Sequence, residues 1–265
     1  MSQLAQIRKL GPLYQLAYAL LTPILGPLTR PHWSGQAPQG GAILVSNHLS
    51  NLDPLVLAYA FGVRGHEVRY LAKAELFKVP VLGSILTRWG MVPVQRGSGH
   101  AADALDQAAI AVQSGQLISI FPEGTITQDP AFWPMKMKTG AARLALATGQ
   151  PLVPVLLWGT QDVMDRKSPW LRLRRTDVYI HVLDPIDISD LPADPANHEV
   201  VTEVTGRIQS ALRTAVSQLR GQDAPERIWD PKSDEHSEAS VKKFSSWRRE
   251  LARKNGRQDI LPGRR

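Results

Sequence analysis

Two short polar segments, each placed where an apolar stretch ends, carry residue types suited to acid–base chemistry. The first holds His48 and, five residues later, Asp53; the second is Phe121-Pro122-Glu123-Gly124-Thr125. A carboxylate that bonds one imidazole nitrogen fixes the tautomer and leaves the other nitrogen free as a general base. Taken singly, Asp53 could be an N-cap before Pro54 and His48 a polar loop residue. Together they predict a base that activates a hydroxyl.

The activated hydroxyl is more plausibly the substrate's than the protein's. The chain has no cysteine, no Gly-x-Ser-x-Gly segment and no His-Glu-x-x-His segment. A nucleophilic hydrolase needs its own serine or cysteine beside the histidine, and a zinc hydrolase of the common type needs the paired histidines. The sequence therefore favours attack by a hydroxyl of the substrate itself.

The distribution of charge favours a membrane surface over nucleic acid. The formal net charge is +7, and residues 241–265 alone contain nine cationic side chains against two carboxylates. A nucleic-acid-binding domain would carry its charge on the fold, whereas a basic tail on a neutral domain suits an anionic membrane surface. We therefore predict an anionic membrane surface and no nucleic acid among the partners, with a merely solvated tail as the alternative.

The N-terminal region predicts a second membrane contact. Residues 10–29 form an uncharged run as long as a membrane span, but Pro12, Pro23 and Pro27 interrupt this run. We expect one or two short helices lying in the membrane interface, with a buried core helix as the alternative. In residues 241–251, apolar side chains at helical spacing among lysines and arginines predict a basic amphipathic helix.

The remaining pattern alternates between strand-like and helix-like pieces, which predicts an α/β fold with a mainly parallel sheet covered by helices. Ligands of such sheets bind beyond the carboxyl ends of strands, where both polar segments lie. We expect an N-terminal membrane-interface segment (1–30), a catalytic domain (31–220) and a basic linker and tail (221–265). The strands are expected at 42–46, 68–72, 91–95, 117–121, 152–158 and 178–183, and the helices at 54–61, 81–89, 101–114, 138–148 and 197–220.

Four motifs occur in order over roughly residues 40–160. They are Asn47-His48 with Asp53, the stretch Lys73-Ala74-Glu75-Leu76-Phe77 leading to Val94-Gln95-Arg96, Phe121 to Thr125, and Pro151-Leu152-Val153-Pro154-Val155. Their content and order resemble those of glycerolipid acyltransferases, in particular the 1-acyl-sn-glycerol-3-phosphate acyltransferase family, whose members make phosphatidic acid.

The resemblance implies direct acyl transfer without an acyl-enzyme. The donor would be acyl-CoA or acyl carrier protein, used as a substrate with no further cofactor or metal, and the acceptor a lysophospholipid, 1-acyl-sn-glycerol 3-phosphate. His48 would take the proton of the acceptor hydroxyl, and Asp53 would orient His48. The same resemblance assigns substrate binding to Asn47, Arg96, Glu123, Gly124 and Thr125.

One departure from the family pattern concerns the phosphate. Many members carry arginine and serine directly after Glu-Gly-Thr, whereas this chain has Ile126 and Thr127. Lys138, at the start of the following helix, is the expected replacement cation, with Lys136 as a second choice.

Several alternatives stay open at this point. Within the family they are a glycerol-3-phosphate acyltransferase and an enzyme for another lysophospholipid or a non-glycerol lipid; outside it they are a lipid hydrolase and a non-catalytic membrane-binding module. The compact form, with a minimal membrane anchor, suggests a bacterial enzyme held peripherally or monotopically on the cytoplasmic face of the cell membrane.

Overall fold

The computed structural model describes residues 10–80, 82–89, 91–94, 101–168 and 170–231. Two expectations fall outside these residues. One is the substrate-binding role of Arg96, and the other is the basic amphipathic helix expected in residues 241–251.

The described strands form one seven-stranded sheet with the order β1-β7-β6-β2-β5-β3-β4. Neighbouring strands are parallel except at β6 and β7, which pair antiparallel. The strands are β1 (Thr29–Ser34), β2 (Ala42–Ser46), β3 (Val68–Lys73), β4 (Val92–Val94), β5 (Leu117–Ile120), β6 (Leu152–Trp158) and β7 (Thr176–Val182).

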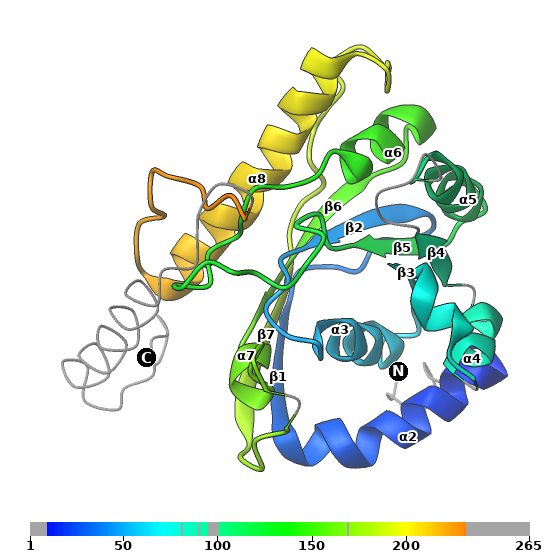
Figure 1. Cartoon of the computed structure of the whole chain (residues 1–265), viewed down its shortest axis with the longest axis vertical. Coiled ribbons are helices and arrows are strands. Elements are labelled where there is room, and N and C mark those ends of the chain that lie inside the picture. The colour runs from blue at the N-terminus through cyan, green and yellow to red at the C-terminus, as the bar shows by residue number, and fades with distance from the viewer. Residues whose placement is uncertain (1–9, 81, 90, 95–100, 169, 232–265) are drawn as a thin grey trace.

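Helices cover both faces of this sheet (Figure 1). They are α2 (Pro12–Leu28), α3 (Asp53–Gly62), the 3-10 helix η1 (Ala74–Lys78), α4 (Leu82–Arg88), α5 (Ala101–Gln113), α6 (Gly140–Thr148), α7 (Thr160–Val163) and α8 (His198–Arg220). Side chains along β2 alternate between the two faces, as the period of two in a strand requires. Leu44 packs in the cluster that contains α2 and α3, and Ile43 in the cluster that contains α5, α6 and α8. The predicted α/β class with a mainly parallel sheet is confirmed.

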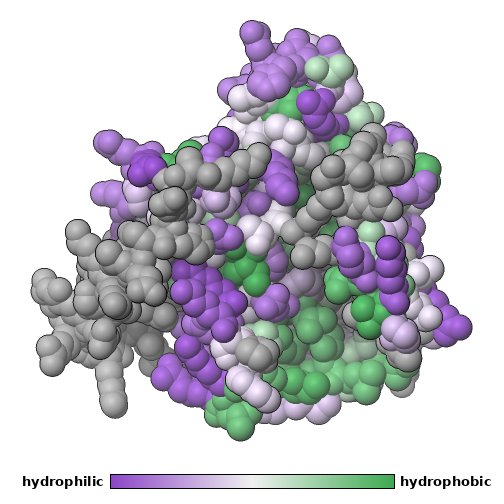
Figure 2. Space-filling view, in the orientation of Figure 1, coloured by the Kyte–Doolittle hydropathy of each residue, from purple (hydrophilic) through white to green (hydrophobic). Residues whose placement is uncertain are grey.

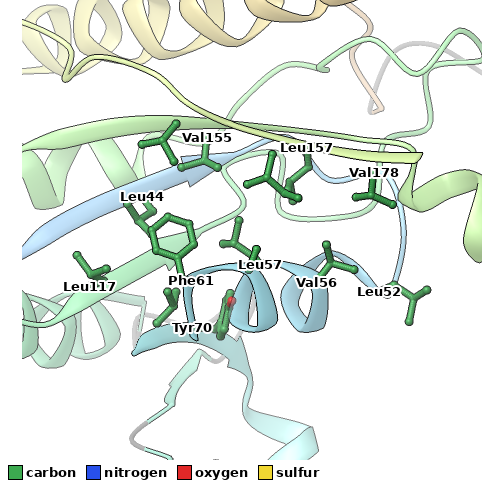
Figure 3. Packing of buried hydrophobic residues seen from close by; sticks show 14 of the residues in the cluster. Leu44, Leu52, Val56, Leu57, Phe61, Tyr70, Leu117, Val155, Leu157 and Val178 are labelled. Atoms are coloured by element: carbon green, nitrogen blue, oxygen red, sulfur yellow. The ribbon is translucent and has the colours of Figure 1, made fainter. Parts of the chain in front are cut away.

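The short helix α3 is held against the sheet by its apolar side. Val56, Leu57 and Phe61 are buried and lie toward Leu44 and Val155 of the central strands (Figure 3). Phe61 is fully buried, so truncating it to alanine would cost about 3 to 5 kcal/mol of folding free energy. This packing fixes the start of α3, and with it the position of Asp53.

The sequence pattern missed β1. Its residues are mostly polar, with Pro31 and one tryptophan among them, and most of them are exposed on this edge strand. Proline is tolerated on an edge strand, where its missing N–H removes no ladder bond. An edge strand without an apolar run gives little periodic signal.

The N-terminal segment forms one continuous helix, α2, which runs through Pro23 and Pro27. Both prolines are exposed, whereas Leu25 and Leu28 are buried in the core. The helix therefore has a side that belongs to the fold, and its chain passes directly into β1. Among the described residues, none of the helices combines the length and the apolar character needed to span a bilayer.

The described start of the predicted linker lies on the protein surface beside residue 136. The backbone N–H of Lys136 donates to the carbonyl of Trp229 at 2.9 Å, and its Nζ lies 2.8 Å from Asp230. Lys136, the second choice for the replacement cation, thus bonds to this segment and does not line the cavity at His48.

Candidate active site

The loop between β2 and α3 brings His48 and Asp53 together. His48 Nδ1 lies 2.8 Å from Asp53 Oδ2, and the same oxygen accepts the backbone N–H groups of Leu49 and Ser50 at 2.5 and 2.8 Å. Asp53 is the first residue of α3 and is fully buried, and no side chain caps that helix. The carboxylate thus bonds backward to the histidine loop, so the N-cap alternative for Asp53 is not adopted.

The imidazole of His48 presents its other nitrogen to a cavity. Its ring stacks on Phe121 with centroids 4.3 Å apart, and 16% of the side chain is exposed. Because Asp53 holds Nδ1, Nε2 is the nitrogen available to a substrate hydroxyl. Phe121 follows β5, the neighbour of β2 in the sheet, so the two polar segments meet at one edge as the topology predicts.

Glu123 joins the two loops from behind the imidazole. One carboxylate oxygen accepts the backbone N–H of His48 at 2.9 Å, and the other accepts that of Met135 at 3.0 Å. The side chain is only 2% exposed, and burial raises the pKa of Glu123 to about 8 against the lowering effect of these hydrogen bonds. Both oxygens are thus committed to the backbone, which gives Glu123 a positioning role toward His48.

Asn47 has a comparable place on the opposite side of the loop. Its amide nitrogen donates to the carbonyl of Leu157, and its oxygen accepts the N–H of the same residue, both at 2.9 Å. The side chain is fully buried. It joins the end of β2 to β6 and so fixes the position of the backbone at the next residue, His48.

A cavity of about 850 Å³ extends from His48 between the sheet and the helices α2, α3 and α4. Its walls are mainly aliphatic and aromatic. They include Tyr14, Tyr18 and Leu21 of α2, Ala58 and Tyr59 of α3, Leu76 of η1, Leu86 of α4, and Trp89 and Met91 beyond it. A mainly apolar cavity of this size that is lined by His48 fits a fatty acyl chain.

A polar rim borders the same cavity at the start of α6. Lys138, Thr139, Gly140 and Arg143 line it together with Gly124. The end of the Lys138 side chain lies across Gly124. A Cβ added at Gly124 would meet Lys138 Nζ at 2.6 Å and Cε at 2.7 Å. Gly124 has φ of +72°, which favours glycine for a second reason. Residues of two cationic types and the N-terminus of a helix thus line the cavity at this place.

The structure divides the predicted site residues into groups. His48, Gly124 and Lys138 line the cavity, whereas Asn47, Asp53 and Glu123 support it from buried positions. Thr125 is half-buried and does not line the cavity.

Sequence reasoning missed Arg143. The signal available was its spacing: four residues after Thr139, at the N-terminus of α6, it falls on the same side of the helix. Its guanidinium also donates to the carbonyl of Pro195.

Among the described residues, no hydroxyl group hydrogen-bonds to the imidazole of His48, whose partner is the carboxylate of Asp53. Ser50, the serine nearest to it in sequence, is fully buried and donates to the carbonyl of Met164 at 2.8 Å. An imidazole held by a carboxylate, with no hydroxyl of the protein bonded to it, can act as a base toward an incoming hydroxyl.

Comparison with known proteins agrees with this class. Residues 30–158, slightly less than half of the chain, match the family model described as Acyltransferase. The chain is 32% identical over 161 residues to the chloroplastic 1-acyl-sn-glycerol-3-phosphate acyltransferase BAT2 of Brassica napus, covering 60% of this chain and 45% of that protein. The match thus spans about half the length of that relative.

Two further matches extend over more of the chain. The lyso-ornithine lipid O-acyltransferase of Pseudomonas aeruginosa is 29% identical over 201 residues, which cover 69% of this chain and 70% of that protein. The crystal structure of the 1-acyl-sn-glycerophosphate acyltransferase PlsC from Thermotoga maritima superimposes with a TM-score of 0.58 at 24% identity, covering 77% of each chain. This last likeness concerns the fold.

Proposed function

We propose that this protein transfers a fatty acyl group from acyl-CoA or acyl carrier protein to the hydroxyl of 1-acyl-sn-glycerol 3-phosphate, giving phosphatidic acid. The observation that carries the proposal is the position of His48 Nε2 between an apolar cavity and a cationic rim. The cavity suits an acyl chain, and the rim formed by Lys138, Arg143 and the start of α6 suits a phosphate.

The geometry supports a single-displacement reaction. The acceptor hydroxyl gives its proton to His48 Nε2 as its oxygen attacks the thioester carbonyl, forming a C–O bond. The imidazolium formed in this step is stabilised by Asp53, whose Oδ2 lies 2.8 Å from Nδ1. The tetrahedral intermediate then collapses, the C–S bond breaks, and His48 returns the proton to the leaving thiolate. No acyl-enzyme forms in this scheme.

Membrane attachment through α2 is part of the proposal. Leu16, Leu20 and Ile24 are large apolar side chains of this helix, and they are 57%, 62% and 48% exposed. Figure 2 shows apolar surface along the lower edge of the molecule, where Figure 1 places α2. A helix with one side in the fold and an apolar side outward suits the interface of a bilayer. Because the thioester donors are cytosolic, we place the protein peripherally on the cytoplasmic face of the cell membrane.

An acceptor without a phosphate is the second candidate. The match to a lyso-ornithine lipid O-acyltransferase covers more of this chain than the match to the Brassica protein. Ile126 also stands where many family members have an arginine. On this alternative, Lys138 and Arg143 would bind the carboxylate of the lysolipid or the phosphates of the donor.

A panel of acceptors tests the proposal. Purified full-length protein is given radiolabelled acyl-CoA or acyl carrier protein with lysophosphatidic acid, glycerol 3-phosphate, lyso-ornithine lipid or a neutral lysolipid, and products are separated by chromatography. We expect phosphatidic acid as the main product, with turnover lost in His48→Ala. A preference for lyso-ornithine lipid would select the second candidate, and release of fatty acid without an acceptor would indicate a hydrolase.

The cationic rim is tested by acceptor dependence. Lys138→Ala and Arg143→Ala should raise the KM for lysophosphatidic acid about tenfold or more, since each removes a charge-assisted contact. Turnover of a neutral lysolipid should change little. An equal loss with both acceptors would contradict a role of this rim in acceptor phosphate binding.

A further inference from the structure

The connection between α7 and β7 carries an unusual exposed surface. Residues 165–175 contain five cationic side chains and one carboxylate. Within this connection, Trp170 and Leu173 are 79% and 90% exposed, which makes them the two most exposed large apolar side chains of the described chain. Residues 165–168 and 170–175 are called the basic loop below. Nothing in the proposed reaction uses these residues.

The base of the basic loop is structured. Leu171 forms an antiparallel bridge with Met164, and both pack against the core cluster that contains α2 and α3. The N–H of Arg172 donates to the carbonyl of Val163 at 2.8 Å, and its guanidinium lies 3.4 Å from Asp165. Trp170 directly precedes Leu171 and Leu173 follows two residues later, so both exposed side chains lie next to this anchored base.

The basic loop lies on the same side of the fold as α2. In the parallel pair of β1 and β7, Thr29 is opposite Thr176. Thr29 directly follows the last residue of α2, and Thr176 directly follows the basic loop, so both segments enter the sheet side by side. Figure 1 shows them along one lower edge of the molecule. The exposed side of α2 and the basic loop therefore border one surface.

The residue types of this surface match one kind of partner. Tryptophan concentrates at membrane–water interfaces, where its ring sits among the headgroups, and leucine contributes burial in the acyl region. Lys167, Arg174 and Arg175 are exposed around these tips and complement anionic headgroups. An acidic protein would also complement the charge. The shared edge with the apolar side of α2, however, favours the bilayer.

We propose that the basic loop is a membrane-docking element that inserts Trp170 and Leu173 between anionic lipids, with Arg174 and Arg175 at their headgroups. It adds a second contact to the α2 attachment suggested under the proposed function. Contact through both α2 and the basic loop fixes how the protein is oriented on the bilayer. Contact through α2 alone would leave the protein able to rotate about the axis of that helix.

Docking at this loop also connects the bilayer to the catalytic loops. The carbonyl of Met164, at the loop base, accepts the hydroxyl of Ser50, two residues after His48. The guanidinium of Arg166 donates to the carbonyl of Thr127 at 2.6 Å, and the N–H of Thr127 donates to the carbonyl of His48 at 2.7 Å. The basic loop is thus joined to the segment after β2 and to the segment after β5. Its docking would therefore fix the distance between His48 and the bilayer surface.

Vesicle binding tests the proposal with the full chain. Binding is measured by sedimentation with phosphatidylcholine vesicles that contain or lack phosphatidylglycerol, without either substrate. We expect the Trp170→Ala/Leu173→Ala pair to weaken binding about tenfold, and the Arg174→Gln/Arg175→Gln pair to weaken binding to anionic vesicles about tenfold or more at low salt. The effect of the arginine pair should shrink in high salt, because salt screens exposed charges.

A matched control and a direct probe keep the result specific. Ile110→Ala removes an apolar side chain that is 63% exposed on α5, away from this edge, and should leave binding unchanged. Brominated phosphatidylcholine should quench the fluorescence of the unaltered protein more than that of Trp170→Phe. Equal quenching, or unchanged binding by both pairs of variants, overturns the proposal.

Activity separates this proposal from the proposed function. Loop variants should retain turnover of a short-chain acceptor below its micellar concentration, while losing turnover on anionic vesicles. A protein without any acyl-transfer activity would refute the proposed function and leave the vesicle result standing. Unchanged vesicle binding with a raised KM for acyl carrier protein would reassign the loop to an acidic protein partner and overturn membrane docking.

Discussion

The loop after β2 and the loop after β5 each contain a buried carboxylate that accepts backbone N–H groups, yet the two carboxylates differ in what else they hold. Asp53 gathers three donors on one oxygen, one of them the imidazole of His48. Glu123 divides its two oxygens between backbone groups of two segments. The same chemical group thus orients a base in one loop and joins loops in the other. Burial alone therefore does not identify the carboxylate that contacts the imidazole.

The sharpest test of this comparison removes the charge of Asp53. Asp53→Asn can keep its three donors on the remaining oxygen but cannot stabilise the imidazolium, so turnover should fall by about 10²- to 10⁴-fold. Steady-state kinetics measure the loss, and circular dichroism checks the fold. Near-normal turnover in a folded variant would show that Asp53 only shapes the loop.

The raised pKa of Glu123 predicts a pH-dependent stability. Its folded pKa of about 8 lies above its ordinary 4.5, so the folded state binds the proton more tightly than the unfolded state. This contribution is fully present below pH 4.5 and is lost as pH rises through about 8. We therefore expect the free energy of unfolding of the unaltered protein, measured with urea, to fall between pH 5 and 8. The fall should exceed that of Glu123→Gln by up to a few kcal/mol. Parallel profiles of the two proteins would contradict this assignment.

The same Glu123→Gln variant should affect turnover less than Asp53→Asn does. Glutamine offers one acceptor and one donor, so one of the N–H groups of His48 and Met135 would face a donor. We expect kcat to fall about tenfold with little change in KM, because the imidazole shifts while the cavity stays intact. Glu123→Asp serves as the matched control that keeps the carboxyl group but shortens its reach. A loss as large as that of Asp53→Asn would erase the distinction between the two carboxylates.

The smallest expected effect concerns the aromatic contact between the loops. Phe121→Leu keeps an apolar side chain but removes the ring that stacks on His48 at 4.3 Å. Such contacts are worth about 0.5 to 1.5 kcal/mol, so turnover should fall only several-fold. Tyr70→Phe is a suitable control, since it alters the hydroxyl bonded to Pro54 and keeps the ring beside Phe121.

The sequence was most informative where periodicity is strong and where a motif is local. The buried strands β2 and β6 lie at the predicted bounds because their apolar runs are continuous, and His48 and Asp53 are close enough in sequence for one turn to join them. The β2–β5 register that brings Glu123 to His48 is a long-range contact, so its hydrogen bonds could not be read from spacing.

The same limit applies to two binding assignments. Glu123 and Asn47 were predicted to bind substrate. In this structure both side chains bond to the backbone, and their contact with a substrate stays a prediction. Arg143 went unnoticed because its relation to the cavity depends on how α6 packs against β2 and α5. Local patterns predict which loops matter, and packing decides which atoms face the ligand.

One consequence of α2 bears on how the protein can be shortened. The helix lines the cavity with Tyr14 and Tyr18, and it also seats Leu25 and Leu28 in the core. A chain starting at Thr29 would thus lose one wall of the cavity and two core leucines along with the exposed apolar side of the helix. Solubility is better sought by replacing Leu16, Leu20 and Ile24 with polar residues, which leaves the wall and the core in place.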